Sequence, residues 1–191
     1  MAPSTAPDGA PADPLLARLR EHVGAPVGDT GPSVAPDPVN QPMIRHWAAA
    51  FEDANPVYVD PEAAAQSRFG GIVAPPLMLQ TWCMATPIIT GIAERGGSPV
   101  ESGGAAVLDL LDAEGYVATL ASNSEFEIER YLSLGESLRS ETLLESVSDR
   151  KQTRIGPGYF VTWVTTYTTD AGEVVGRQTF RILKFRPELP T

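Results

Sequence analysis

The stretch FEDANPVYVD, residues 51–60, decides how the rest of the chain is interpreted. Asn55-Pro56 ends the helical spacing that precedes it, because a proline disfavours helical geometry at the residue before it. Asp53 and Asn55 carry short polar side chains that suit such a turn. The same carboxylate and amide could instead face a pocket, so two roles stay open. Tyr58 follows, with a hydroxyl whose solution pKa of about 10 makes it a poor base at neutral pH.

An amphipathic helix is predicted immediately before the turn. Asn40 suits the N-cap of that helix and Pro42 its first turn. One apolar stripe runs along it and contains Met43, Ile44, Trp47 and Phe51. His46 lies on the same helix, close in sequence to Asp53. It is a candidate base if it faces a pocket, and otherwise a packed, hydrogen-bonded side chain.

The residues after the turn combine glycines with prolines. PEAAAQSRF (61–69) predicts a short helix that ends at Gly70-Gly71. These glycines allow close backbone approach, and Pro75 and Pro76 have no N–H group. The backbone donors near the positive end of the next helix are therefore those of Gly71, Ile72, Val73 and Ala74. They suit a developing oxyanion, although a plain helix entry would have the same sequence.

The next helix is predicted over APPLMLQTWCMATPIITGI (74–92), which is apolar on almost every side and therefore buried. Gly- and acid-rich residues 94–115 predict a loop. Long strands are predicted at 116–132, 136–149, 158–170 and 174–187. The short turns between them indicate an antiparallel meander. The predicted class is α+β, with a curved antiparallel sheet wrapped around one long central helix.

The predicted strand at 158–170 is apolar on both faces. One face carries Tyr159, Val161, Trp163 and Tyr167, and the other carries Phe160 and Val164. A single helix cannot cover both faces, so a partner subunit is expected.

Length and composition indicate one domain. The chain has 191 residues, 42% hydrophobic and 20% charged, enough for a sizeable core. Residues 1–33 are predicted to be a flexible Pro/Ala-rich tail with a short helix, and residues 34–187 the domain. No signal peptide or membrane span is expected. The single cysteine, Cys83, excludes an internal disulfide and fits a reducing cytoplasm.

The charges exclude some ligands and favour others. A net charge of −10 argues against nucleic acid. Two histidines, His22 and His46, with one cysteine do not make a metal site. Basic residues nevertheless gather late in the chain, at Arg150, Lys151, Arg154, Arg177, Arg181, Lys184 and Arg186. They either bind a small polyanion or form a solvated turn and strand edge.

FEDANPVYVD followed by FGGIVAPPLML resembles the signature of the MaoC-like hot-dog dehydratases and hydratases. That signature is Asp-x-Asn-Pro-aliphatic-His and then a Gly-aliphatic-aliphatic segment. Asp53, Asn55, Pro56 and Val57 match it, and Tyr58 stands at the histidine position. The later strands resemble the FAS1-like, N-terminal-type branch, and the resemblance covers about residues 34–187.

MIRHWAAAFEDANPVYVD, GGIVAPPLMLQTW and FRILKFRP resemble most closely the larger MaoC-like subunit of actinobacterial enoyl-CoA hydratases that degrade steroid side chains, as in cholesterol catabolism. This resemblance implies a hydro-lyase complex, a heterodimer or heterotetramer, in which a smaller MaoC-like subunit carries the catalytic Asp and His. Some larger subunits carry a further zinc-containing domain, which we do not expect here because the sequence ends at Thr191.

The resemblance also assigns roles to residues. No catalytic residue is expected in this chain, because the motif Asp53, Asn55, Tyr58 is degenerate. Substrate-binding residues would be Tyr58, Gly70, Gly71, Ile72, Val73 and Ala74. CoA-binding residues would be Arg150, Lys151, Arg154, Lys184 and Arg186. No cofactor beyond the CoA of the substrate, and no metal, is expected, and the location would be cytoplasmic.

Two alternatives remain open. The chain could be a self-sufficient hot-dog thioesterase or hydratase that uses Asp53 with His46 or Tyr58. It could also be a non-catalytic acyl-CoA-binding protein.

Overall fold

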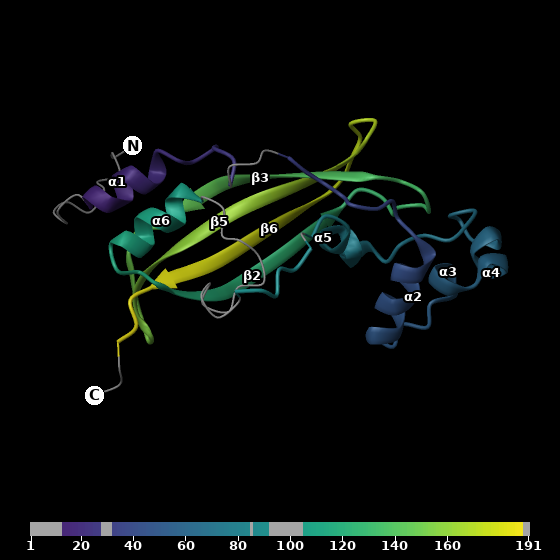
Figure 1. Cartoon of the computed structure of the whole chain (residues 1–191), viewed down its shortest axis with the longest axis horizontal. Coiled ribbons are helices and arrows are strands. Elements are labelled where there is room, and N and C mark those ends of the chain that lie inside the picture. Colours follow the sequence, from purple (N-terminus) through teal and green to yellow (C-terminus); the bar gives the residue numbers. More distant parts are fainter. Residues whose placement is uncertain (1–12, 28–31, 85, 92–104, 189–191) are drawn as a thin grey trace, which may run out of the picture.

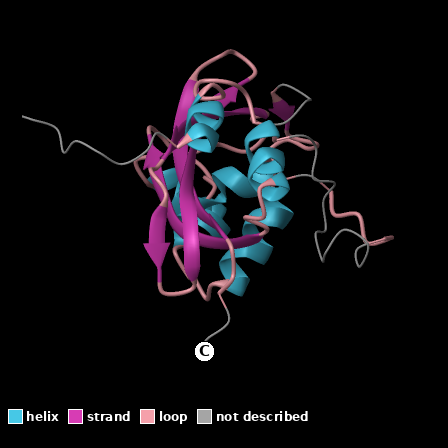
Figure 2. Ribbon diagram, turned by 90° about the vertical axis from the view of Figure 1, so that its left-hand side faces the viewer, coloured by secondary structure: helices cyan, strands magenta, loops and turns pink. Residues whose placement is uncertain are grey.

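The computed structural model describes residues 13–27, 32–84, 86–91 and 105–188. One antiparallel sheet has the helices gathered on one side of it (Figure 1, Figure 2). The helices are α1 (Pro14–Arg20), α2 (Gln41–Ala50), α3 (Pro56–Val59), α4 (Pro61–Gln66), the 3₁₀ turn η1 (Pro76–Met78), α5 (Leu79–Trp82) and α6 (Ala106–Ala113). The strands are β1 (Ser33–Val34), β2 (Ala118–Ile128), β3 (Leu138–Val147), β4 (Lys151–Thr153), β5 (Gly156–Thr169) and β6 (Val174–Phe185). The α+β class predicted from the sequence is confirmed.

The sheet has the order β1-β3-β5-β6-β2, with β4 paired to β5. Only β3, β5 and β6 therefore form the predicted meander, and the expectation that all four long strands follow in order is wrong. β2 pairs with β6 at the opposite edge, because residues 129–137 cross one end of the sheet instead of making a tight turn. Backbone hydrogen bonds from Glu129 to Val175 and from Ala74 to Leu132 hold this crossover in place.

Two separate hydrophobic cores lie on the helical face of the sheet. One joins α2, α3 and α5 to the sheet through Tyr167 and Val175. The other joins α1 and α6 to the sheet through Tyr159 and Val161. Figure 1 shows these helix groups at opposite ends of the long strands. The sheet is therefore covered at both ends by different parts of the chain.

The predicted long central helix is wrong in the described residues. Residues 76–82 form only η1 and α5, and residues 83, 84 and 86–91 are not helical. Pro87 contributes to this ending, because it lacks the N–H group that would bond to the Cys83 carbonyl in a continued helix. The loop predicted at 94–115 is also wrong in part, since α6 forms at Ala106–Ala113 and buries Val107 and Leu111.

The N-terminal segment is more closely attached than predicted. Asp13 caps α1, and Leu16 and Leu19 of that helix are buried in the second core. The residues that follow α1 pair with β3, through an isolated bridge between Pro26 and Leu143 and through β1. Residues 1–12 of the predicted tail lie outside the described residues. No helix in the described parts of the chain is long and apolar enough to cross a membrane.

Gly176 on β6 gives a test of how α5 sits on the sheet. A Cβ atom there would lie 2.6 Å from Leu79 Cδ1 and 2.7 Å from the Glu127 carbonyl oxygen. We expect Gly176→Ala to lower the free energy of unfolding by about 1–3 kcal/mol, because the contact overpacks the core. Gly71→Ala is the matched control, since a Cβ at Gly71 meets nothing within 4 Å. Urea unfolding measures both, and equal stability of the two variants would contradict this packing.

Candidate functional site

The degenerate motif forms a turn and the cap of a short helix. Asp53 Oδ1 accepts a hydrogen bond from the Asn55 N–H at 3.0 Å. Asn55 Oδ1 in turn accepts one from the Val57 N–H at 3.3 Å and caps α3. Both side chains thus satisfy backbone donors that a bend before Pro56 leaves unpaired. This geometry agrees with the turn role considered for Asp53 and Asn55.

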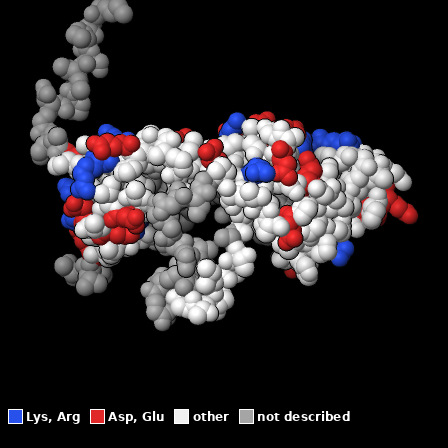
Figure 3. Space-filling model, turned by 45° about the horizontal axis from the view of Figure 1, so that its top comes forward, with Lys and Arg blue, Asp and Glu red and all other residues white. Residues whose placement is uncertain are grey.

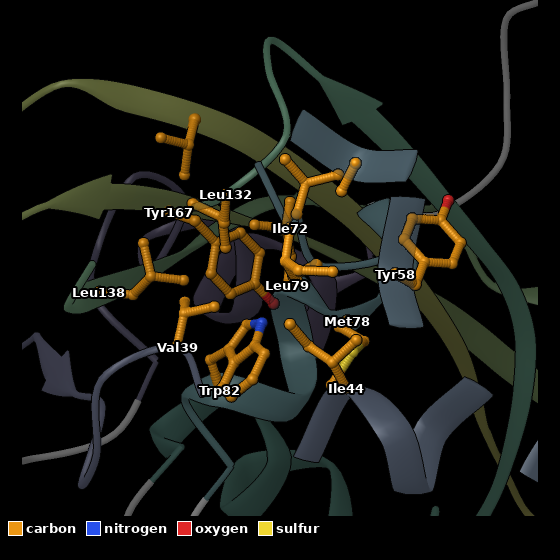
Figure 4. Close-up of a cluster of buried hydrophobic side chains, with 14 residues drawn as sticks. Val39, Ile44, Tyr58, Ile72, Met78, Leu79, Trp82, Leu132, Leu138 and Tyr167 are labelled. Carbon is orange, nitrogen blue, oxygen red and sulfur yellow. The ribbon is translucent and has the colours of Figure 1, made fainter. Parts of the chain in front are cut away.

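Tyr58 is buried on α3, with 6% of its surface exposed. Figure 4 shows its ring at the edge of the first core, with the hydroxyl directed away from the other labelled side chains. Burial, followed by the nearby Tyr131 hydroxyl and the Asp53 carboxylate, raises the pKa of Tyr58 above its usual value. The hydroxyl is therefore neutral at physiological pH. It can donate or accept a hydrogen bond, but it cannot serve as a base for water.

The glycine segment is only partly available to a ligand. The Val73 N–H bonds to the Val57 carbonyl at 3.3 Å, and the Ala74 N–H to the Leu132 carbonyl at 2.8 Å. Within the described residues the N–H groups of Gly71 and Ile72 have no acceptor. The dipole of the following helix was expected to strengthen these donors. That helix, α5, has only four residues, so its dipole is small.

A cavity of about 880 Å³ lies beside the motif, at the end of the sheet that the crossover spans. Its walls include Phe69, Val73 and Tyr131. The Phe69 and Tyr131 rings meet edge to face at 4.7 Å, and the Arg68 guanidinium lies 4.7 Å from the Phe69 ring centre. Sequence reasoning did not single out Arg68, Phe69 or Tyr131. They belong to loops whose position depends on the crossover.

Arg130 fixes the rim of this cavity. Its guanidinium forms bidentate hydrogen bonds with both the Glu136 and Glu173 carboxylates and one more with the Tyr131 carbonyl. All five of its N–H donors are thereby used, so Arg130 is not available to a ligand phosphate. The hydrogen bonds to Arg130 hold the pKa of Glu136 below its usual range, and also that of Glu173.

The histidines lie apart from a built site. His46 is exposed on α2, and His22 is half-buried in the turn after α1. Within the described residues, no cluster of three or more His, Cys, Asp and Glu side chains could hold a metal ion.

The five predicted CoA-binding residues have different environments. Arg150 and Arg186 line one cavity of about 710 Å³ with Tyr116 and Tyr159. Arg186 lies over the Tyr116 ring at 4.4 Å, and the nearby Tyr116 hydroxyl raises the pKa of Arg150 above its usual value. This cavity is at the α1–α6 end of the sheet, where Figure 3 shows basic and acidic side chains intermixed.

The other three basic residues lie outside that cavity. Lys184 is buried and forms an ion pair with Asp112 at 2.5 Å, so it is unavailable to a phosphate. Lys151 and Arg154 are exposed, on β4 and in the turn that follows it.

Comparison with known proteins identifies the family. The model of the FAS1-like, dehydratase domain region matches residues 25–178. This chain belongs to the FAS1-like dehydratase family. A MaoC-like dehydratase from Rhodospirillum rubrum has the same fold, with a TM-score of 0.54 and 24% identity over 85% of this chain and 94% of that one. The predicted hot-dog fold and the predicted family are both confirmed.

Several relatives of this FAS1-like chain have names that refer to function. It is 42% identical over 172 residues to the probable enoyl-CoA hydratase alpha subunit of Thermomonospora curvata, which is 90% of this chain and 52% of that protein. It is 39% identical over 160 residues to the 3-oxo-4,17-pregnadiene-20-carboxyl-CoA hydratase alpha subunit of Mycobacterium tuberculosis, 84% of this chain and 49% of that one. The chain thus spans about half the length of the curated relatives it matches.

A solved structure gives a closer match in length. A chain in the crystal structure of the ChsH1-ChsH2 complex from Mycobacterium tuberculosis has a TM-score of 0.75 and 35% identity, and the match covers 92% of both chains.

Replacement of Glu136 tests the network at the rim of the cavity. Since the folded state lowers its pKa below the ordinary 4.5, the carboxylate stabilises the fold above that pH, and this contribution is lost as the pH falls through the lowered pKa. Glu136→Gln should cost about 1 kcal/mol at pH 7. The difference from the unsubstituted protein should shrink below pH 4.5. Thermal unfolding between pH 3 and pH 7 measures this, and a pH-independent difference would contradict it.

Proposed function

We propose that this chain is one subunit of a heteromeric enoyl-CoA hydratase. The observation that carries the proposal is that one carboxylate oxygen of Asp53 and the amide oxygen of Asn55 accept turn hydrogen bonds, while a neutral Tyr58 occupies the position of the base. The relatives named as hydratase alpha subunits support the reaction and imply a second kind of subunit. The complex with two named components, ChsH1 and ChsH2, supports the same assembly.

Hydration of an enoyl-CoA needs a paired acid and base, which the described residues of this chain do not bring together. A base must take a proton from the water that attacks the β-carbon, and an acid must protonate the α-carbon. Fixed donors must also stabilise the enolate oxygen of the thioester. A smaller hot-dog partner with an intact Asp and His would supply the acid and the base. This chain would contribute pocket walls, the Tyr58 hydroxyl and the N–H groups of Gly71 and Ile72.

The partner would pair along β2. This strand is a sheet edge of 11 residues, mostly exposed, and its outer side is unpaired within the described residues. Such an edge is a liability unless another chain covers it. If the β2 edge of this chain pairs antiparallel with the equivalent edge of the partner, a twofold axis relates the two subunits. The strands of the partner then run in the opposite direction to those of this chain. The motif of the partner would then lie beside the α1–α6 end of this chain.

That arrangement would bring this cavity, which Asp13, Glu114 and Asp149 line together with two arginines, near the chemistry of the partner. Arg150 and Arg186 line it, and arginine suits the phosphates of CoA. Exposed Lys151 and Arg154 would add to the local positive charge. Lys184 is not part of the proposed site, because it is buried and already forms an ion pair with Asp112.

The substrate would be a bulky α,β-unsaturated acyl-CoA. The relative from Mycobacterium tuberculosis is named for a pregnadiene carboxyl-CoA, which favours a steroid side chain here also. Acid–base chemistry of this kind requires no metal or redox cofactor beyond the CoA of the substrate. With its single cysteine, the chain would act in the cytoplasm.

Reconstitution of this chain with the proposed smaller hot-dog subunit tests the proposal. The chain alone should not hydrate crotonyl-CoA or a steroid enoyl-CoA, and the mixture should hydrate the steroid substrate. Asp53→Asn in the mixture should keep the rate within about twofold, because the amide oxygen still accepts the turn hydrogen bond. Native mass spectrometry should give a heteromer. Turnover by the chain alone, abolished by Asp53→Asn, would establish the self-sufficient alternative, and binding without turnover would establish the acyl-CoA-binding alternative.

Arg150 tests the proposed CoA site. In the mixed complex, Arg150→Gln should raise KM for an acyl-CoA about tenfold by removing a charge-assisted hydrogen bond to phosphate. It should leave KM unchanged for the matching acyl-pantetheine, which lacks those phosphates. Arg139→Gln is the matched control. Arg139 of β3 is exposed and forms an ion pair with Asp170 of the β5–β6 turn, outside the cavity that Arg150 lines. Equal effects on both substrates would exclude phosphate contact.

A further inference from the structure

The cavity at the α1–α6 end of the sheet is lined by charges of both signs. Its cations are Arg150 and Arg186, and its anions are Asp13, Glu114 and Asp149. Taken alone, these side chains carry more negative than positive charge, which would disfavour the phosphates of CoA. Each of the three anions, however, has a partner in a neighbouring element, and helix α1 or its capping residue takes part in every one of these contacts.

Two arginines in the last turn of α1 each pair with one of the acids. Arg18 Nη1 lies 3.5 Å from Glu114 Oε1, and Arg20 Nη2 lies 3.0 Å from Asp149 Oδ1. Neither arginine is among the described residues that line the cavity. Both pairs are about half exposed or more, so each contributes little to stability. Their effect on an anion in the cavity is different, because each arginine cancels a charge that would repel it.

Each of these two acids also adjoins one of the cavity arginines. Asp149 directly precedes Arg150 in the connection between β3 and β4. The backbone carbonyl of Glu114 accepts hydrogen bonds from the Arg186 guanidinium. An unpaired carboxylate at either place would therefore oppose the attraction between a phosphate and the neighbouring arginine.

The third acid fixes the position of α1. Asp13 Oδ1 caps the helix by accepting from the Leu15 and Leu16 N–H groups at 3.1 and 3.2 Å. Asp13 Oδ2 accepts from the hydroxyl of Tyr159, a buried residue of β5, at 2.5 Å. Leu16 and Leu19 pack into the second core, and Figure 1 shows α1 and α6 together at this end of the sheet. The last turn of α1 is thereby held against the two remaining acids.

We propose that α1 adjusts the charge of the CoA site. Arg18 and Arg20 do not bind phosphate themselves but neutralise Glu114 and Asp149. With both arginines counted, the charge around the cavity becomes net positive. The two are positioning residues, because they act on the phosphates only through the acids. The inference rests on the proposed function, since it explains how a cavity with three acids accepts a polyanion.

Binding to the mixed complex tests this inference without turnover. Calorimetry compares a saturated acyl-CoA with the matching acyl-pantetheine, which lacks the phosphates. Arg20→Gln should weaken acyl-CoA binding about threefold, the size of effect expected from one exposed charge, and should leave acyl-pantetheine binding unchanged. Arg20→Lys keeps the charge and should keep the affinity. The loss in Arg20→Gln should disappear at about 1 M salt, where the Debye length falls to roughly 3 Å.

A second substitution separates neutralisation from direct phosphate contact and from detachment of α1. Arg20→Gln with Asp149→Asn removes both charges and should restore the affinity of the unsubstituted complex for acyl-CoA. Asp149→Asn alone should bind acyl-CoA more tightly than the unsubstituted complex does. The pair Arg18→Gln and Glu114→Gln should behave in the same way. Removing Asp149 could restore neither a lost phosphate contact nor a detached helix.

The ion pair of Arg139 with Asp170 provides the control. It is similarly exposed and lies at the other end of β3, so Arg139→Gln changes the net charge equally and should leave both affinities unchanged. Unaltered acyl-CoA binding in Arg20→Gln, or a loss that Asp149→Asn does not restore, would overturn the inference while hydration by the complex still supported the proposed function. The expected changes in a complex that hydrates no enoyl-CoA would instead overturn the proposed function and leave the inference standing.

Discussion

The mismatch in length between the long strands and the short helix over them governs this structure. The 14 residues of β5 span about 46 Å, while the four residues of α5 span about 6 Å. One such helix can cover only one end of the sheet. The other end needs α1 and α6, which the chain brings from residues far from α5 in sequence. The middle of the helical face then lies between two cores, and its side chains are polar because neither core includes them.

The crossover before β3 depends on a second interaction, the double ion pair of Arg130. Its two carboxylate partners lie in different places, Glu136 in the crossover itself and Glu173 in the turn between β5 and β6. The guanidinium therefore ties the connection between the two sheet edges to the sheet. Tyr131 follows Arg130 directly, so the same bonds position the ring that contacts Phe69 and faces Tyr58. The cavity beside the motif keeps its shape through this network.

Much of the fold could be predicted from local pattern. The cap at Asn40, the turn at Asn55 and the alternation along β5 and β6 are properties of neighbouring residues. The central helix was predicted wrongly because apolar composition outweighed Pro87, whose effect on the preceding residue is local and strong. The position of β2 could not be predicted, since nothing in a strand identifies which edge it joins. For the same reason Arg130 and Tyr131 were missed, because their roles depend on residues about 40 or more positions away.

The candidate site shows why most residues of a catalytic motif can be present in a chain that lacks the catalytic residue itself. Asp53, Asn55 and Pro56 determine the backbone of the turn, and loss of either capping oxygen would leave donors unpaired at the start of α3. The side chain at position 58 has no such role in the backbone, because the Tyr58 ring packs against the first core and only its hydroxyl meets Tyr131. Folding therefore constrains three positions of the motif through the backbone, whereas at position 58 it requires only a side chain that packs against the first core. A chain whose partner supplies the base is free to change only that fourth residue. The motif then indicates the fold reliably and the reaction only when its last residue is present.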